Sequence, residues 1–105
     1  MPDLRPIGIF DSGAGGLSVM HQLVKELPHE SFVYFADSAN CPYGSKPQEK
    51  IIERSSAVTD FLISQQCKII VVACNTATAA AIDWLRDTYD IPFVGMEPAV
   101  KPAAI

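Results

Sequence analysis

The segment from Lys68 to Cys74 contains the run Ile69-Ile70-Val71-Val72, which most strongly limits what this chain can fold into. The run is rich in β-branched residues and has no polar alternation, so a strand formed here is buried on both faces. Such strands belong to parallel sheets that carry helices on both sides. The run therefore predicts that residues 68–74 form a central strand of a parallel sheet.

Strands and helices alternate along the rest of the chain. Three more strands are predicted, at Pro6 to Phe10, at Phe32 to Ala36 and at Ile91 to Met96. The first helix follows a Gly-rich turn, covers residues 17–27 and ends at Pro28, and an alanine-rich helix begins at Asn75 or Thr76 and ends near Tyr89. Between them, residues from position 48 onward carry helical periodicity.

The middle helix has its own start signals. Ser45 and Gln48 have the spacing of a capping box, and Pro47 suits a first helical turn. The residues expected on its buried face are Ile51, Ile52, Val58, Phe61 and Leu62.

This order of elements indicates an α/β protein. A strand, helix and strand repeated three times predict a parallel β-sheet sandwiched by helices, a three-layer arrangement of the Rossmann-like or flavodoxin-like kind. We expect residues 1–96 to form one α/β lobe and residues 97–105, with Pro98 and Pro102, to begin a connection to a second lobe. The sequence is thus expected to be part of a longer protein.

Composition excludes several other classes. The chain has 105 residues, net charge −4 and eight scattered Lys and Arg residues, which disfavours direct nucleic-acid binding. The longest apolar run is too short for a membrane span, and residues 1–6 lack the long apolar core expected of a secretion signal. Cysteine is present three times, without Cys-x-x-Cys spacing, and the two histidines lack metal-ligand spacing, so neither a disulfide framework nor a metal site is expected. A reducing, cytoplasmic location fits.

Polar or Gly-rich segments follow three predicted strands, where active sites of parallel sheets form. Residues 11–16 read Asp-Ser-Gly-Ala-Gly-Gly, and their amides at a helix start suit an anionic group. A dinucleotide loop is one alternative, with Asp37 as the acid that binds the ribose, although Ser18 replaces the third glycine and Asp11 would repel a pyrophosphate. A plain tight turn is the other alternative.

Cys74 ends the most buried strand and precedes a helix. The helix dipole and free amides stabilise a thiolate at such a position, so Cys74 is a candidate nucleophile or general base, the alternative being a small buried hydrophobic residue. Cys67 reads as structural, and Cys41, in a loop, is a weaker candidate for a direct role. Tyr43 and Ser45 offer hydroxyls and Gly44 allows close approach, unless this segment is only a surface loop.

Three motifs in order resemble one family closely. They read FDSGAGGLSV at residues 10–19, YFAD at 34–37 with PYG at 42–44, and ACNTA at 73–77, and VGMEPA at 94–99 extends the likeness over essentially the whole chain. The sequence resembles the N-terminal part of the glutamate racemases, within the aspartate/glutamate racemase superfamily. An aspartate or hydantoin racemase is a less similar alternative.

The resemblance implies a two-lobed, cofactor-independent isomerase that inverts the α-carbon of glutamate between two cysteines and supplies D-glutamate for peptidoglycan. It implies that Cys74 is one acid/base, that Asp11 tunes it, and that no metal or pyridoxal phosphate takes part. The implied substrate contacts are Asp11, Ser12, Tyr43, Gly44, Asn75 and Thr76.

One departure from the family limits this expectation. The second cysteine of the family lies in a Gly-Cys-Thr-His motif, which this sequence does not contain. We therefore expect an N-terminal fragment of a homo-oligomeric enzyme, inactive by itself, that binds glutamate as its small-molecule partner. The alternative from another class is a non-catalytic α/β binding or assembly domain with a vestigial pocket.

Overall fold

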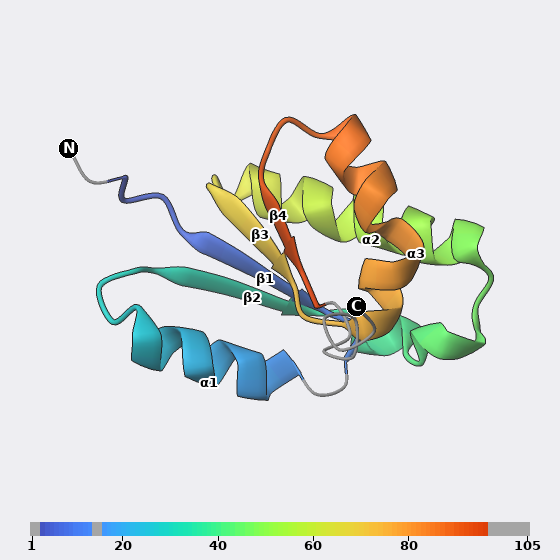
Figure 1. Cartoon of the computed structure of the whole chain (residues 1–105), viewed down its shortest axis with the longest axis horizontal. Coiled ribbons are helices and arrows are strands. Elements are labelled where there is room, and N and C mark those ends of the chain that lie inside the picture. The colour runs from blue at the N-terminus through green and yellow to red at the C-terminus, as the bar shows by residue number, and fades with distance from the viewer. Residues whose placement is uncertain (1–2, 14–15, 97–105) are drawn as a thin grey trace, which may run out of the picture.

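The computed structural model describes residues 3–13 and 16–96, which form a parallel sheet between helices (Figure 1). The predicted connection at 97–105 lies outside the described residues. The elements, in chain order, are β1 (Ile7–Asp11), α1 (Gly16–Glu26), β2 (Phe32–Ala36), the short 3₁₀ turns η1 (Ser38–Asn40) and η2 (Tyr43–Ser45), α2 (Gln48–Ser64), β3 (Ile69–Val72), α3 (Asn75–Thr88) and β4 (Phe93–Gly95).

The sheet has four parallel strands in the order β2-β1-β3-β4. β3 lies between β1 and β4, and Ile70 and Val72 are fully buried, so the prediction of a central strand is confirmed. The register of the β1–β3 pair places Ile7 beside Ile69 and Phe10 beside Val72. This pairing brings the carboxyl ends of β1 and β3 to the same place.

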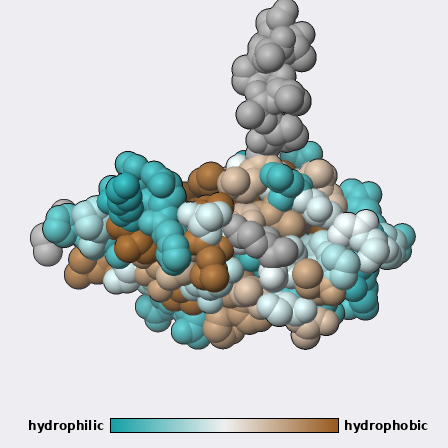
Figure 2. Space-filling model, turned by 90° about the horizontal axis from the view of Figure 1, so that it is seen from below, coloured by the Kyte–Doolittle hydropathy of each residue, from teal (hydrophilic) through white to brown (hydrophobic). Residues whose placement is uncertain are grey.

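Helices cover both faces of the sheet, which confirms the three-layer arrangement (Figure 1). On the side of α2 and α3, Phe10 and Ile70 pack with Leu62 and Leu85 in the larger core cluster. On the other side, α1 is the one helix among the described residues that covers the sheet, over Ile9 and Val71 among others. Apolar surface therefore reaches the solvent on the α1 side, as the view in Figure 2 shows.

The start of α2 differs from the prediction. Pro47 is the N-cap of α2 rather than a residue of its first turn, and no side chain caps the helix. The Ser45 hydroxyl instead donates to the Pro42 carbonyl at 3.3 Å, because Ser45 belongs to the preceding 3₁₀ turn. The predicted capping box is therefore wrong.

The buried face of α2 is also not quite the predicted one. Phe61 is 41% exposed and lies at the rim of the core, against the ring of Phe35. Ser55 and Thr59 are fully buried instead. The prediction left Ser55 and Thr59 out of the buried face because they are polar. Small hydroxyl side chains fit where a helix packs closely against its neighbours.

No helix among the described residues combines the length and the apolar character that crossing a membrane requires.

The chain leaves β1 through Gly13, whose φ of 111° lies in the left-handed region. A Cβ added to Gly13 would lie 2.9 Å from the Cα of Ser38, so glycine is required both by conformation and by space.

We predict that Gly13→Ala lowers the free energy of unfolding by about 1–3 kcal/mol, the usual cost of a non-glycine residue in such a conformation. Urea denaturation of the purified chain measures this. Gly44→Ala is the matched control, since nothing lies within 4 Å of an added Cβ at Gly44. Equal unfolding midpoints for the two variants would contradict the described turn.

Candidate active site

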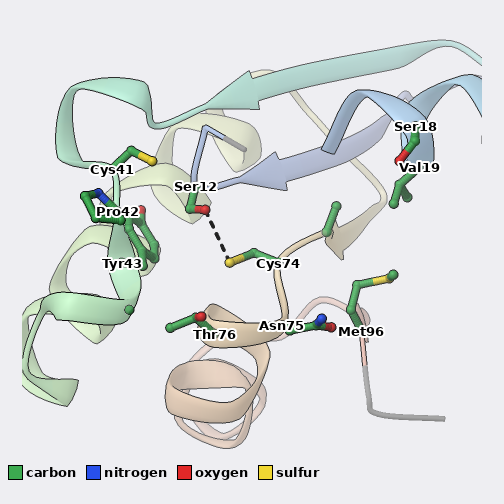
Figure 3. A pocket seen from close by; sticks show the side chains of 12 residues that line it. Ser12, Ser18, Val19, Cys41, Pro42, Tyr43, Cys74, Asn75, Thr76 and Met96 are labelled. Carbon is green, nitrogen blue, oxygen red and sulfur yellow. Dashed lines mark hydrogen bonds between the residues drawn. The ribbon is translucent and has the colours of Figure 1, made fainter. Parts of the chain in front are cut away.

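A cavity of about 450 Å³ lies at the carboxyl edge of the sheet, where the segments after β1, β2 and β3 meet (Figure 3). Small side chains, both polar and apolar, form most of its walls. The lining residues are Ser12, Ser18, Val19, Cys41, Pro42, Tyr43, Gly44, Ala73, Cys74, Asn75, Thr76 and Met96.

Cys74 lies at the centre of the described polar contacts of this cavity. Its thiol donates to the Ser12 hydroxyl oxygen at 3.4 Å (Figure 3). Its sulfur accepts the backbone N–H of Ala77, also at 3.4 Å. The half-buried Cys74 is thus the N-cap of α3. The Ala77 amide donates to this sulfur, and the Ser12 hydroxyl can rotate to donate as well.

Asn75 and Thr76 occupy the first turn of α3 and line the cavity. The first backbone N–H groups of a helix lack partners inside the helix and lie at the positive end of its dipole. Together with an amide and a hydroxyl side chain, they suit the carboxylate of a small ligand. The predicted group of Ser12, Cys74, Asn75 and Thr76 is therefore brought together in the structure.

Asp11, one of the implied substrate contacts, is not among the residues that line the cavity. It is 1% exposed, and its Oδ2 accepts the Gly16 N–H at 3.0 Å and the Tyr34 hydroxyl at 3.1 Å. Burial, and then Asp11, raise the pKa of Tyr34. Residues alternate across a strand, so Asp11 points to the same side as Ile9, toward α1, and Ser12 to the other side. That alternation was the sequence signal for its direction.

Tyr43 lines the cavity, but its hydroxyl is not offered to a ligand. The hydroxyl donates to Asp37 Oδ2 at 2.6 Å, and the side chain is only 2% exposed. Burial raises the pKa of Tyr43 well above its ordinary value, and the Asp37 carboxylate adds to the shift. Ser45 is likewise engaged with Pro42, so Gly44 provides the open part of this wall.

Asp37 organises the loop after β2. Its carboxylate accepts the Tyr43 hydroxyl, the Asn40 side-chain amide and two N–H groups of Arg54. Burial opposes ionisation of Asp37, but these donors, Arg54 first, outweigh it and hold the pKa of Asp37 below its ordinary value. A 4% exposed carboxylate with these partners is not free for a ribose, so the dinucleotide alternative is wrong.

Several residues of the site were missed from the sequence. Arg54 lies on α2, 17 positions after Asp37, and carried no signal beyond its charge. Met96 and Val19 are apolar residues that the fold places at the rim. Cys41 was not missed: the weaker candidate from the sequence is an exposed thiol in the same cavity wall as Cys74.

Cys67 lies elsewhere. It is buried against Gly8, where an added Cβ would lie 3.1 Å from the Cys67 sulfur. Burial raises the pKa of its thiol. Within residues 3–13 and 16–96, no group of three or more His, Cys, Asp or Glu residues is arranged to hold a metal ion.

Comparison with known proteins decides the family. The profile of the Asp/Glu/Hydantoin racemase family matches residues 7–105. The chain belongs to this racemase family. Among curated relatives, the glutamate racemase of Campylobacter curvus is 57% identical over 98 residues, and that of Herpetosiphon aurantiacus is 54% identical over 99 residues.

Solved racemase structures agree with the fold. The glutamate racemase of Thermus thermophilus, in complex with β-chloro-D-alanine, superposes with a TM-score of 0.84 at 46% identity over 96% of this chain. That of Escherichia coli, in complex with L-glutamate and the activator UDP-MurNAc-ala, gives 0.86 at 41% identity over 95% of this chain. This racemase-family chain spans 37–39% of the length of the two curated relatives and 38% of each of these two structures.

We predict that iodoacetamide modifies Cys74 faster than Cys67 at neutral pH. Cys74 is half-buried in an open cavity and has donors for a thiolate, whereas burial both shields Cys67 and raises the pKa of its thiol. Mass spectrometry of each cysteine peptide, with alkylation followed from pH 6 to 10, measures the two rates. Superimposable pH profiles would contradict a prepared sulfur at position 74.

Proposed function

We propose that this chain is the N-terminal catalytic lobe of a glutamate racemase, with residues 97–105 beginning the connection to a second lobe. The observation that carries the proposal is the place of the Cys74 sulfur, between the Ser12 hydroxyl and the Ala77 amide at the wall of a small cavity. Membership of the racemase family and the names of the curated relatives give the reaction class.

In the proposed reaction, Cys74 is the acid/base on one face of the substrate α-carbon. The Cys74 thiolate takes the α-proton and becomes a thiol, and the electron pair stays on the substrate as a planar carbanion. A second thiol on the opposite face then gives its proton to the α-carbon and becomes the thiolate. The reverse reaction exchanges the two roles, so no redox cofactor or metal is required.

The other cavity residues hold the substrate in this proposal. Asn75, Thr76 and the first amides of α3 bind a substrate carboxylate, where they also offset charge that develops at the carbanion. Ser12 orients the Cys74 sulfur, and Gly44 allows the substrate to approach the loop wall closely. Asp11 supports the site from outside the cavity, since it accepts the Gly16 N–H and so fixes the start of α1.

The finer aspects of the proposal come from the relatives. Solved glutamate racemases include complexes with L-glutamate and, for Francisella tularensis, with D-glutamate, which supports a site that accepts both enantiomers. The second thiol is assigned to a part of the protein outside this sequence, which has no Gly-Cys-Thr-His motif. We further propose a cytoplasmic homo-oligomer that supplies D-glutamate for peptidoglycan.

We predict that the 105-residue chain exchanges the α-proton of glutamate at most on one face and does not invert it. D-Glutamate is incubated with the chain in deuterated water, and optical rotation and α-deuterium are followed together. The longest protein encoded by the same gene is expected to lose rotation and gain deuterium at matching rates. Cys74→Ala is expected to lower that rate by about 10³-fold or more, since general acid–base catalysis contributes about 10²–10⁴-fold per group.

Two further variants separate the cysteines. Cys67→Ala is the matched control, because Cys67 lies outside the cavity, and should retain the rate of the unmodified protein. Cys41→Ala tests the other thiol of the cavity wall and should change the rate less than Cys74→Ala. Full inversion by the chain alone, or an active Cys74→Ala protein, would refute the assignment.

A further inference from the structure

Arg54 lies outside the cavity wall but is bound to the residue that organises part of it. Its Nε donates to Asp37 Oδ2 and its Nη2 to Asp37 Oδ1, both at 3.0 Å, so the guanidinium grips both carboxylate oxygens. This two-bond geometry is the strong and directional form of an ion pair. Arg54 belongs to α2, so the contact ties the loop after β2 to a helix on one face of the sheet.

The contact continues to the cavity through Tyr43. The Tyr43 hydroxyl donates to the same Asp37 Oδ2, at 2.6 Å, and the buried ring of Tyr43 packs against Phe10. Tyr43 lies between Pro42 and Gly44, and all three residues line the cavity. The Asp37 side chain therefore fixes this wall through one hydroxyl, and Arg54 fixes the Asp37 side chain.

Asp37 also connects this wall to the opposite one. Its backbone N–H donates to the Asp11 carbonyl at 2.8 Å, next to Ser12, which contacts the Cys74 sulfur. Asp37 therefore has hydrogen bonds to the loop wall and to the residue that precedes Ser12.

The charge of Arg54 is what allows this arrangement. A carboxylate that is 4% exposed carries a large desolvation cost unless it is paired, and Arg54 is the one cation recorded in an ion pair with Asp37 among the described residues. Without it, Asp37 either stays charged and draws water into the loop or takes up a proton and loses part of its acceptor capacity. Either response loosens the hold on Tyr43.

We propose that Arg54 is a positioning residue of the substrate site: through Asp37 and Tyr43 it fixes the wall formed by residues 41–44 and so sets how tightly substrate is held. The inference rests on the proposed racemase function. It assigns to Arg54 no contact with substrate and no part in proton transfer. Its loss should therefore affect substrate binding much more than the chemical step.

The first test reads the wall directly and needs no activity. Hydrogen–deuterium exchange of the chain is compared between the unmodified protein, Arg54→Met and Arg54→Lys. Arg54→Met should speed exchange in peptides covering residues 38–46 and leave those of β3 and α3 unchanged. Arg54→Lys should lie between, because it keeps the charge but loses the two-bond grip. Unchanged exchange at residues 38–46 in Arg54→Met would overturn the proposal.

The second test uses the longest protein encoded by the gene. Arg54→Met should raise KM for glutamate about tenfold with kcat changed less than about threefold, the pattern of lost substrate binding. Arg86→Met is the matched control, because Arg86 anchors β4 by donating to the Phe93 carbonyl, away from this loop. A fall in kcat at unchanged KM, or an Arg86→Met protein with the same kinetic change, would refute the positioning role.

A double variant keeps the test decisive if Arg54→Met does not fold. Arg54→Met with Asp37→Asn removes both charges and leaves an amide oxygen that can accept from Tyr43. The double variant should recover the fold and part of the substrate affinity. Its KM should be no lower than the KM of Asp37→Asn with Arg54 intact, because the double variant lacks the ion pair between Arg54 and Asp37. A double variant with normal KM and normal exchange would refute the proposal. A wild-type protein without racemase activity would instead refute the proposed function. The exchange test would then still show whether Arg54 fixes residues 41–44.

Discussion

The parallel pairing of β1 with β3 determines where the parts of the candidate site lie. The register places Phe10 beside Val72, and the Ala73 N–H continues the pairing by donating to the Phe10 carbonyl at 2.7 Å. The chain therefore leaves both strands at the same point of the sheet edge. Ser12 and Cys74, 62 positions apart in sequence, meet there at 3.4 Å. Because β1 and β3 are both interior strands, packing on both faces holds this meeting point in place.

Local patterns were enough to predict the layers of the fold and one half of the site. The apolar run at residues 69–72 indicated an interior strand, and the polar residues after Cys74 indicated a helix start, which the structure confirms. Parallel strands have their carboxyl ends at one edge, so the meeting of Ser12 with Cys74 followed from topology alone. These features depend on hydrophobic periodicity and backbone pairing, which a sequence records directly.

The directions of polar side chains could not be predicted in the same way. The sequence does not say which acceptor the Tyr43 hydroxyl uses, because Tyr43 lies in a loop. In the structure the acceptor is Asp37, whose carboxylate is held by Arg54, and the packing of α2 brings Arg54 near. The cost of burying the Asp37 carboxylate decided this outcome, and that cost depends on tertiary neighbours. Asp11 is different, because strand alternation alone indicates that it points toward α1, where it contacts Gly16.

We propose that the cavity beside Cys74 is the glutamate-binding half of a racemase site, and ¹⁵N–¹H NMR titration of the chain with D-glutamate tests this proposal directly. Because only one wall of the proposed site is present, binding is expected to be weak, so the titration extends to high millimolar ligand. We expect shifts at the amides of Ser12, Gly44, Asn75 and Thr76. We expect no shifts at Gln66 and Lys68, which border a cavity at the other edge of the sheet. Shifts centred on that other cavity, or none near Cys74 at any concentration, would contradict it.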